Sequence, residues 1–270
     1  MHVTPAFPAQ LFHSGTCRVS PVLIIPEKIS ISLMVDTSQT IAEAKRAAGY
    51  HAADMVEDGM VLGLGTGSTV FYMMERLSGR IRDGLCVSGV PTSFQTAILA
   101  REYGIPLTTL DDNPLLDIAM DGADQVDPSL FIIKGRGAAH TREKCVVSAA
   151  FRFVVVVDQA KMVPRLAGLV PIEIIPFALT PAMNQLRGLG GVPKLRNGVQ
   201  KDGPVITDNG NYIVDCRFDE IQNPEELEET IDHIPGIVEN GLFTGFREKT
   251  TIIVGHKKKC RVITSTDIIP

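Results

Sequence analysis

Short apolar segments alternate with longer amphipathic segments in the first half of the chain. Residues 60–65 ("MVLGLG"), 85–91 ("LCVSGVP") and 152–158 ("RFVVVVD") are short and mostly apolar, which is typical of strands buried on both faces of a parallel sheet. Segments 68–81 and 138–151 mix apolar and polar residues at helical spacing. This alternation predicts an α/β fold in which helices cover both faces of a parallel sheet.

Further elements extend this pattern. Strands are predicted at 105–110, 116–124 and 130–135, and a helix at 93–104. The first helix is expected to start at Thr37, where Ser and Thr residues precede Ala, Ile and Val at helical spacing.

The pattern changes after residues 168–176 ("GLVPIEIIP"). The next segments are predicted as a helix (178–191), a strand (192–196), a strand (204–218) and a helix (223–235). This order suits a small split α+β unit of ferredoxin-like type. The tail, residues 236–245 ("GIVENGLFTG") and 249–264 ("KTTIIVGHKKKCRVIT"), is β-rich and is expected to return to the first sheet.

The predicted organisation has three parts. Residues 37–170 together with 240–270 form a large domain around the parallel sheet, and residues 171–239 form a small α+β domain. Residues 1–36 form an extension, which is disordered, an organelle transit peptide, or an over-long translation ahead of Met34. A transit peptide would direct the protein to the plastid stroma, and otherwise a cytoplasmic protein is expected.

Composition excludes several classes of protein. The chain has 270 residues, 44% hydrophobic and 21% charged, and no apolar run approaches the roughly 18 to 20 residues that span a bilayer. The net charge of −5 argues against a nucleic-acid partner. The five cysteines lack CxxC spacing and the six histidines form no ligand pattern, so neither a disulfide framework nor a metal site is expected.

A glycine-rich loop, "GLGTGST" (63–69), separates a predicted strand from a predicted helix. Backbone amides and the positive end of a helix favour a bound anion there. Position 68 is a serine where a dinucleotide loop needs its third glycine, and the lysine of a nucleotide P-loop is missing. The hydroxyls of Thr66, Ser68 and Thr69 suit a small sugar phosphate. The alternative is a tight turn with Ser68 or Thr69 as helix N-cap.

A second cluster of polar residues follows two later strands. Asp121, Asp124 and Lys134 fall just past predicted strands, so they are expected on the rim where ligands of open parallel sheets bind. The amides of 135–137 and the lysine could stabilise an oxyanion, and a desolvated Glu143 would have the raised pKa of a general base. The alternatives are an Asx-turn with an N-cap, and a solvated "TREK" helix face.

These motifs resemble type A ribose-5-phosphate isomerase. The family pattern of GxGTGST, DGADE, KGGG and TREK reads here "GLGTGST", "DGADQ" and "KGRGAAHTREK". The match continues through "VVVVDQAK", "VPIEIIP", "TDNGNYIVD" and "IPGIVENGLF", from about residue 40 to about residue 255. The segments "PTSFQT" and "YGIPLTTLD" are most similar to cyanobacterial and plastid members.

The resemblance implies a fold, a reaction and an assembly. The fold is a Rossmann-like catalytic domain with a smaller ferredoxin-like domain, in a homodimer or homotetramer. The reaction interconverts D-ribose 5-phosphate and D-ribulose 5-phosphate through a cis-enediol(ate), without a cofactor. It belongs to the non-oxidative pentose phosphate pathway or the Calvin cycle.

The resemblance also implies residue roles. Glu143 is the general base, Asp121 assists ring opening, and Asp124 and Lys134 bind the sugar and steady the oxyanion. The implied substrate-binding residues are Thr66, Gly67, Ser68, Thr69, Asp121, Gly122, Ala123, Asp124, Lys134, Gly135, Arg136, Gly137, Lys161 and Lys45. Lys45 is a weaker candidate for the phosphate, and a solvated loop lysine is the alternative for Lys161.

Two positions depart from the family pattern. Gln125 replaces a glutamate, for which we expect at most a moderate effect on rate. Arg136 replaces a glycine, and it would be strained if the backbone there needs a positive φ.

Three other readings compete with the isomerase. A sugar-phosphate sensor would need a helix-turn-helix, which residues 1–36 do not show. An amino-sugar phosphate deaminase or a CoA transferase would lack the KGxG to TREK arrangement or need its own glutamate nucleophile. A catalytically silent relative is disfavoured because the four implied catalytic residues are present.

Overall fold

The computed structural model of the chain describes residues 27–257 and 259–267. From residue 38 onward, the described chain belongs to one compact unit. Residues 1–26, which make up most of the predicted extension, lie outside the described residues, and the three alternatives for the extension stay predictions. No helix in the described part of the chain is long and apolar enough to cross a membrane.

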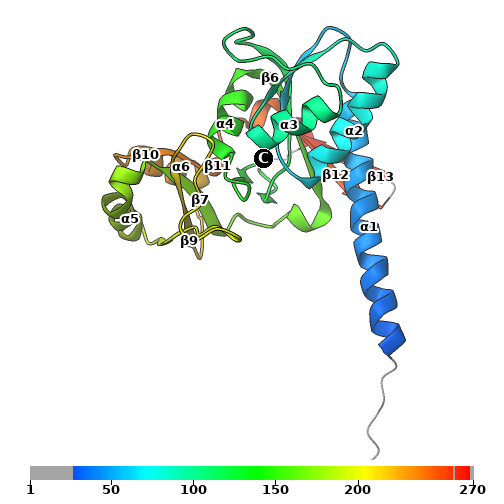
Figure 1. The fold of residues 1–270 in the computed structure, drawn as a ribbon. Helices are drawn as coiled ribbons and strands as arrows, with labels where there is room; N and C mark the ends of the chain where they lie inside the picture. The colour runs from blue at the N-terminus through cyan, green and yellow to red at the C-terminus, as the bar shows by residue number, and fades with distance from the viewer. Residues whose placement is uncertain (1–26, 258, 268–270) are drawn as a thin grey trace, which may run out of the picture. The chain divides into compact units, whose positions relative to one another are not determined.

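The larger of the two main sheets has six strands in the order β13-β12-β6-β3-β1-β2. Figure 1 labels β6, β12 and β13 of this sheet. Its strands are β1 (Val61–Leu64), β2 (Ser88–Pro91), β3 (Leu116–Asp121), β6 (Ala150–Asp158), β12 (Thr250–His256) and β13 (Lys259–Thr264). All neighbouring pairs are parallel except β12 with β13. Residues 250–256 and 259–264 of the predicted tail therefore join this sheet, whereas residues 236–245 do not, because their strands pair with strands of the two other sheets. Because β2 and β3 lie on opposite sides of β1, the strand order reverses there. Such a reversal opens a crevice at the carboxyl ends of β1 and β3.

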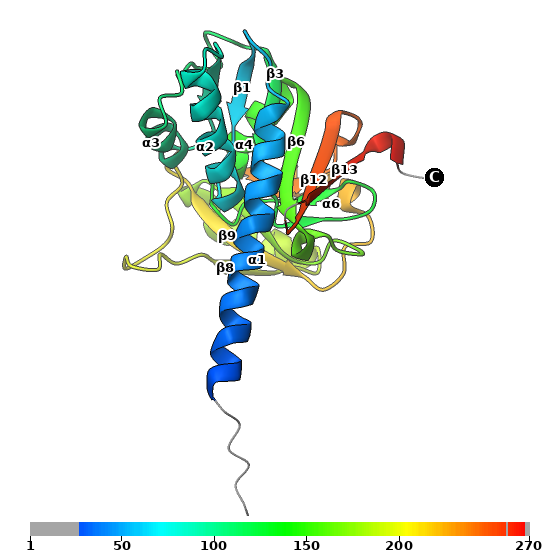
Figure 2. The same cartoon turned by 90° about the vertical axis from the view of Figure 1, so that its right-hand side faces the viewer.

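Helices cover both faces of this sheet. They are α1 (Glu27–Asp54), α2 (Ser68–Arg82), α3 (Phe94–Glu102) and α4 (His140–Ala149). Ala48 of α1 and Met73 of α2 pack in one core cluster with Leu62 of β1, and α1 and α2 lie side by side over the strands in Figure 2. Val146 of α4 packs with Phe153 of β6 in a second core cluster. The described part of the chain therefore has the predicted α/β class, with a Rossmann-like arrangement.

The second main sheet has four antiparallel strands in the order β10-β7-β9-β8. Its elements are β7 (Gly168–Ile174), α5 (Leu179–Gly188), β8 (Val192–Leu195), β9 (Tyr212–Phe218), α6 (Pro224–Asp232) and β10 (Ile237–Asn240). This is the ferredoxin-like βαββαβ order. Along β7, Val170, Ile172 and Ile174 pack with α5 and α6, whereas the alternate residue Glu173 contacts α4. The exact division of the chain into domains stays a prediction.

Four predicted elements differ from the structure. The strand predicted at 204–218 forms only over 212–218, as β9, because residues 204–211 contain a turn and isolated bridges such as Ile206 with Tyr212. Residues 130–135 contain only β5 (Ile132–Ile133), which joins β4 (Gln125–Val126) and β11 (Leu242–Phe243) in a small antiparallel sheet. The connection 122–131 is shorter than the roughly dozen residues that a parallel crossover needs. Residues 105–110 form only a bridge between Gly89 and Leu107.

The first helix begins at Glu27 and not at the predicted Thr37. Pro26 precedes it, and no further proline occurs before Pro91. Proline ends a helix because it lacks the amide hydrogen, but it is tolerated at a helix start. The sequence between 27 and 36 therefore contains no strict helix breaker, although its β-branched residues weaken the helical pattern.

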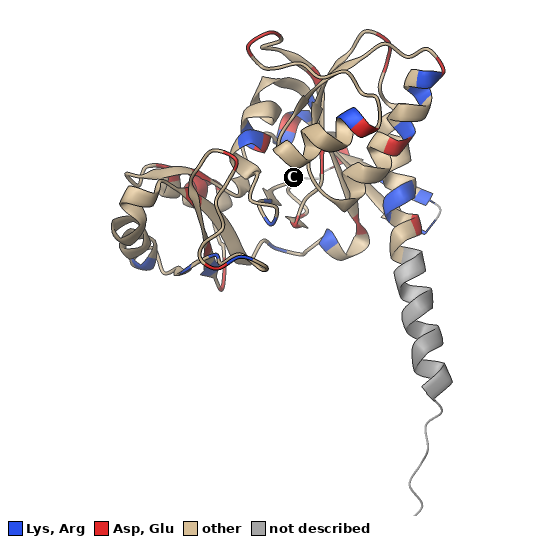
Figure 3. Cartoon of the chain, viewed as in Figure 1, with Lys and Arg blue, Asp and Glu red and all other residues tan. Residues whose placement is uncertain are grey.

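Four 3₁₀ turns complete the described elements: η1 (Gln159–Lys161), η2 (Pro176–Ala178), η3 (Arg247–Lys249) and η4 (Ser265–Asp267). Basic and acidic residues are interspersed along α2 and α4 (Figure 3). Pairs such as Arg76 with Asp54, at 2.8 Å, are well exposed. Exposed pairs of this kind typically contribute about 1 kcal/mol or less to stability. The buried charges described below therefore have larger electrostatic effects.

Candidate active site

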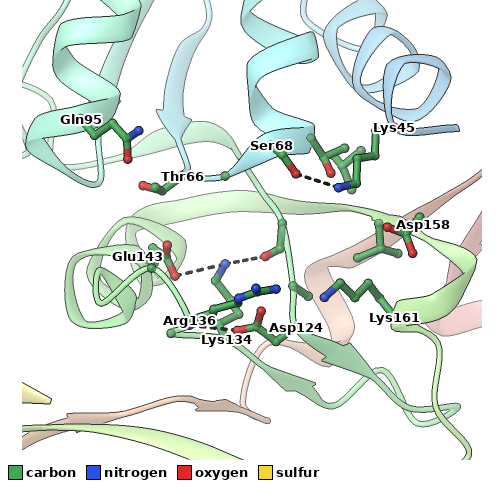
Figure 4. A pocket seen from close by; sticks show the side chains of 18 residues that line it. Lys45, Thr66, Ser68, Gln95, Asp124, Lys134, Arg136, Glu143, Asp158 and Lys161 are labelled. Atoms are coloured by element: carbon green, nitrogen blue, oxygen red, sulfur yellow. Dashed lines mark hydrogen bonds and ion pairs between the residues drawn. The ribbon is translucent and has the colours of Figure 1, made fainter. Parts of the chain in front are cut away.

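A cavity of about 520 Å³ lies at the carboxyl ends of β1 and β3 (Figure 4). It is lined by Lys45, Thr66, Gly67, Ser68, Thr69, Gln95, Gly122, Ala123, Asp124, Lys134, Gly135, Arg136, Gly137, Glu143, Val156, Val157, Asp158 and Lys161. Every residue predicted for the site lines this cavity except Asp121, which contacts Lys134 beneath it. Within the described ranges, no group of three or more His, Cys, Asp or Glu side chains is arranged to hold a metal ion.

The glycine loop places the start of α2 against the cavity. Gly67 is the N-cap, with φ of 127°, and no side chain caps the helix. The predicted alternative of Ser68 or Thr69 as N-cap is therefore wrong, because the chain enters the helix through a conformation that glycine readily adopts. The Nζ of Lys45 donates to the Oγ of Ser68 at 2.9 Å. Amides at a helix start, beside a lysine and a hydroxyl, favour an anion such as phosphate.

Thr66 holds the loop in place through its hydroxyl. Its Oγ1 lies 2.9 to 3.1 Å from hydroxyl oxygens of Thr92, Ser93 and Thr96. Its backbone N–H donates to Oδ1 of Asp121 at 3.0 Å. The Thr66 hydroxyl is thus engaged within the protein, and the loop is tied to both β3 and the start of α3.

The core of the site is an ammonium group between two carboxylates. The Nζ of Lys134 lies 3.1 Å from Oδ2 of Asp121 and 3.1 Å from Oε2 of Glu143, and the three side chains are only 3% to 5% exposed. Lys134 also donates a hydrogen bond to the carbonyl of Gly122. Neither carboxylate oxygen facing the lysine accepts a well-aligned hydrogen bond from the described residues. The lysine interacts with them chiefly as a charge.

Burial and the surplus of negative charge control protonation in this group. Burial, reinforced by the charge of Asp121, raises the pKa of Glu143 to about 8, although Lys134 acts against the rise. Burial also raises the pKa of Asp121, against Lys134 and the amides of Gly122 and Thr66. Burial alone would lower the pKa of Lys134, but the two carboxylates together raise it. Lys134 therefore stays charged, and Glu143 is the group that exchanges a proton near neutral pH.

The loop after Lys134 accommodates the arginine that departs from the family pattern. The positive φ values fall on Gly135 (106°) and Ala138 (59°) and not on Arg136, so the expected strain at Arg136 does not arise. The backbone N–H of Arg136 donates to Oδ2 of Asp124 at 3.0 Å. This bond fixes the Asp124 carboxylate at the cavity wall.

The second departure, Gln125, points away from the cavity. Its Nε2 donates to the carbonyl of Ala167 at 2.7 Å, and its Oε1 accepts from the N–H of Ala167 at 3.1 Å. An amide can make this pair of bonds, whereas an ionised carboxylate can only accept.

Lys161 approaches the cavity on η1, opposite Lys45 (Figure 4). Asp158, at the end of β6, caps this turn by accepting from the N–H of Ala160 at 3.0 Å. Lys161 therefore lines the cavity, and its role in binding substrate stays a prediction.

Helix α4, which carries Glu143, is tied to the four-stranded sheet. The hydroxyl of Thr141 donates to Oε2 of Glu173, a fully buried carboxylate that Thr207, Asn209 and Asn211 also bind. These bonds lower the pKa of Glu173 in spite of its burial. A helix face of "TREK" residues is thus not solvated, because Glu143 and Lys144 are buried and Thr141 is hydrogen-bonded.

Sequence reasoning missed several cavity residues: Gln95, Val156, Val157 and Asp158. It also missed the hydroxyl cluster of Thr92, Ser93 and Thr96. The signal for the cluster was present, because three hydroxyl residues in "PTSFQT" follow a predicted strand of the same sheet.

The fold and the cavity define a class of protein. It is a Rossmann-like α/β protein whose cavity lies between a glycine-rich loop at a helix start and a buried acid–lysine group, where the strand order reverses. Such a cavity suits a small phosphorylated ligand.

Comparisons with known proteins identify the family. The family model for ribose 5-phosphate isomerase A (phosphoriboisomerase A) matches residues 88–259. A ribose-5-phosphate isomerase A of Methanoregula boonei is 69% identical over 237 residues, which are 88% of this chain and 100% of that protein. A cyanobacterial one, of Thermosynechococcus vestitus, is 52% identical over 82% of this chain and 94% of its own.

Solved structures agree with this result. Ribose 5-phosphate isomerase A of Methanocaldococcus jannaschii is 45% identical, with a TM-score of 0.78 over 82% of this chain and 98% of its own. A D-ribose-5-phosphate isomerase in complex with phospho-erythronic acid is 43% identical, with a TM-score of 0.80 over 83% of this chain and 99% of its own. The chain belongs to the ribose 5-phosphate isomerase A family, and it is an enzyme of the isomerase class.

We expect Gly65→Ala to disable the site without unfolding the protein. A Cβ at Gly65 would overlap the carboxyl group of Asp121 and displace it from Lys134. Small misplacements of a reacting group can cost about 100-fold, so kcat/KM should fall at least about tenfold. Gly245→Ala is the control, since a Cβ there meets no atom within 4 Å. Equal activity of the two variants would contradict the tight packing of Gly65 on Asp121.

We expect His140 to make the fold sensitive to acid. Its Nε2 donates to the carbonyl of Glu239 at 3.3 Å, Nδ1 has no partner among the described residues, and burial lowers its pKa to about 4. The unfolded chain takes up a proton near pH 6.5 and the folded chain only near 4, so stability is complete above 6.5 and falls below it.

The expected loss between these pH values is at most about 3 kcal/mol. Urea unfolding from pH 7 to pH 4.5 measures it, with His140→Gln beside the wild type. The variant should lose less stability on acidification. A loss as large as that of the wild type would exclude His140 as the responsible group.

Proposed function

We propose that the enzyme interconverts D-ribose 5-phosphate and D-ribulose 5-phosphate through a cis-enediol(ate), with Glu143 as general base. The observation that carries the proposal is the buried contact of Glu143 with Lys134 at one side of a cavity whose other side is an anion-binding loop. A five-carbon sugar phosphate bound between them has its phosphate at the loop and its C1 and C2 beside Glu143. The relative solved with phospho-erythronic acid supports a phosphorylated polyhydroxy ligand in such a site.

The proposed phosphate site uses groups from two sides. The amides of the α2 start, Ser68 and Lys45 bind the phosphate from one wall, and Lys161 binds it from the other. Asp124 accepts hydrogen bonds from sugar hydroxyls near the middle of the cavity. Asp121, 3.1 Å from the Nζ of Lys134, assists opening of the furanose ring.

The proposed chemical step moves one proton between neighbouring carbons. The ionised Glu143 removes the proton from C2 of the open aldose, and the electron pair of that bond forms the C1–C2 double bond. Negative charge develops on the O1 oxygen, where the Lys134 ammonium stabilises it. Glu143 then returns the proton to C1, while the O2 hydroxyl proton passes to O1 and leaves a C2 carbonyl. The reaction is balanced without an external reductant, oxidant or metal.

In a cell, this activity would serve the non-oxidative pentose phosphate pathway or the Calvin cycle. The assembly as a homodimer or homotetramer stays a prediction, and light scattering of the purified protein would determine it.

The first test is Glu143→Gln. Turnover of ribose 5-phosphate, measured with a chelator present, should fall by roughly 100-fold or more, which is typical of losing a general base. Glu229→Gln is the matched control, because Glu229 is exposed on α6. If Glu143→Gln kept the turnover of the wild type, Glu143 would not be the general base. Absence of turnover in the wild type, with ribose 5-phosphate still bound, would indicate a sensor or a silent relative.

The second test is pH dependence. Because Glu143 reacts as the carboxylate and its pKa is raised to about 8, kcat/KM should rise with pH and level off above about 8. Asp121→Asn removes a charge that contributes to the rise, so its residual kcat/KM should level off at lower pH. Profiles from pH 6 to 9.5 for both proteins measure the shift. A wild-type profile that is flat over this range would contradict the assignment.

A further inference from the structure

Arg196 reaches the loop after Lys134 from the four-stranded sheet. It follows β8, and its backbone is fixed on both sides, since its N–H donates to the carbonyl of Ile213 and its carbonyl accepts from Val205, each at 2.8 Å. Its Nε and Nη2 form a bidentate pair with Asp215 of β9, with Nε at 2.9 Å from Oδ2. The side chains of Arg196 and Asp215 are 17% and 21% exposed. The guanidinium is thus held in one orientation.

The remaining arm of this guanidinium binds two consecutive carbonyl groups. Its Nη1 donates to the carbonyl of Gly135 at 3.0 Å and to the carbonyl of Arg136 at 3.0 Å. Five donors in a planar fork allow an arginine to make both sets of contacts at once. A lysine ammonium has only three donors on one nitrogen, so it could not reproduce this arrangement.

These two bonds act on the orientation of the loop amides together with a bond inside the loop, in which the N–H of Ala138 donates to the carbonyl of Gly135 at 3.0 Å. A trans peptide group is planar, with its carbonyl and N–H on opposite sides, and the described residues contain no cis peptide bond. Because Arg196 binds the carbonyl of Gly135, the N–H of Arg136 points the other way, and it donates to Asp124 at 3.0 Å. By the same geometry, the N–H of Gly137 points away from Arg196, and Gly137 lines the cavity.

The loop also needs an external constraint. Ala138 adopts φ of 59°, in the left-handed region that is unfavourable for a non-glycine residue. A short segment with such a residue persists only when its surroundings determine its conformation. Arg196 contributes to that constraint through its bonds to the carbonyls of Gly135 and Arg136, which follow Lys134 and line the same cavity.

We propose that Arg196, oriented by its bidentate pair with Asp215, is a positioning residue of the active site. It orients the peptide groups of residues 135–137 so that Asp124 and the loop amides face the sugar. The proposal rests on the proposed isomerase function for its kinetic consequence. Its structural content, the fixed loop, is independent of that function.

The test compares Arg196→Met and Arg196→Lys with Arg217→Met. Arg217 is an exposed arginine of β9 whose partner Asp219 is also exposed, so it is the matched control. Both Arg196 variants should lower kcat/KM by about 10- to 100-fold relative to the control, which is the scale of a misplaced reacting group. Most of the loss should be in kcat. The dissociation constant for inorganic phosphate should change less than twofold, because the glycine loop is untouched.

A third variant separates positioning from folding. Asp215→Asn keeps one of the two acceptors that hold Arg196, so its loss should be smaller than that of Arg196→Met. If the activity loss of these variants followed the fraction of unfolded protein, Arg196 would be a structural residue only. Arg196 variants within twofold of the control would also overturn the proposal.

Amide hydrogen–deuterium exchange gives a readout that does not need activity. Peptides covering residues 134–139 should exchange faster in Arg196→Met than in Arg217→Met, in the otherwise folded protein. Unchanged exchange would overturn the proposal even if the wild type is an active isomerase. Faster exchange in a protein without turnover would leave the fixed loop correct and reject the isomerase function.

Discussion

The charge of Lys134, buried between Asp121 and Glu143, is the constraint on which the site depends. Two carboxylates and one ammonium leave a net negative charge inside the protein, which is tolerable only if a proton is shared or a ligand compensates it. Burial, together with the negative charge of Asp121, raises the pKa of Glu143 to about 8. The burial that makes this charged group costly therefore also brings the pKa of Glu143 towards neutral pH.

The fold brings these three residues together from separate elements. Asp121 ends β3, Lys134 follows β5, and Glu143 lies in the first turn of α4. The reversal of strand order at β1 leaves room for a ligand above β3, and the four-stranded sheet holds α4 and the intervening loop through Glu173 and Arg196. The four-stranded sheet therefore contributes to the site through anchoring contacts, although none of its strands lines the cavity.

Periodicity and motifs predicted much of this from the sequence. The buried strands and the cavity residues from Thr66 to Lys161 carry local signals, because strand ends, glycines and charged residues adjoin one another. The small sheet with β5 escaped prediction, since two residues of strand carry no periodicity and only loop length excludes a parallel crossover. The contacts of Arg196 and Glu173 escaped too, because they depend on how two sheets pack, which spacing along the chain does not encode.

The contacts of Gln125 make its replacement by the glutamate of the family pattern unfavourable. Its amide both donates to and accepts from the backbone of Ala167. A glutamate at this position would set an ionised acceptor against the carbonyl of Ala167, and it would add a further negative charge near Asp124. Restoring the residue of the family pattern is thus not a neutral exchange in this background. The effect of a substitution at position 125 therefore depends on the backbone of Ala167.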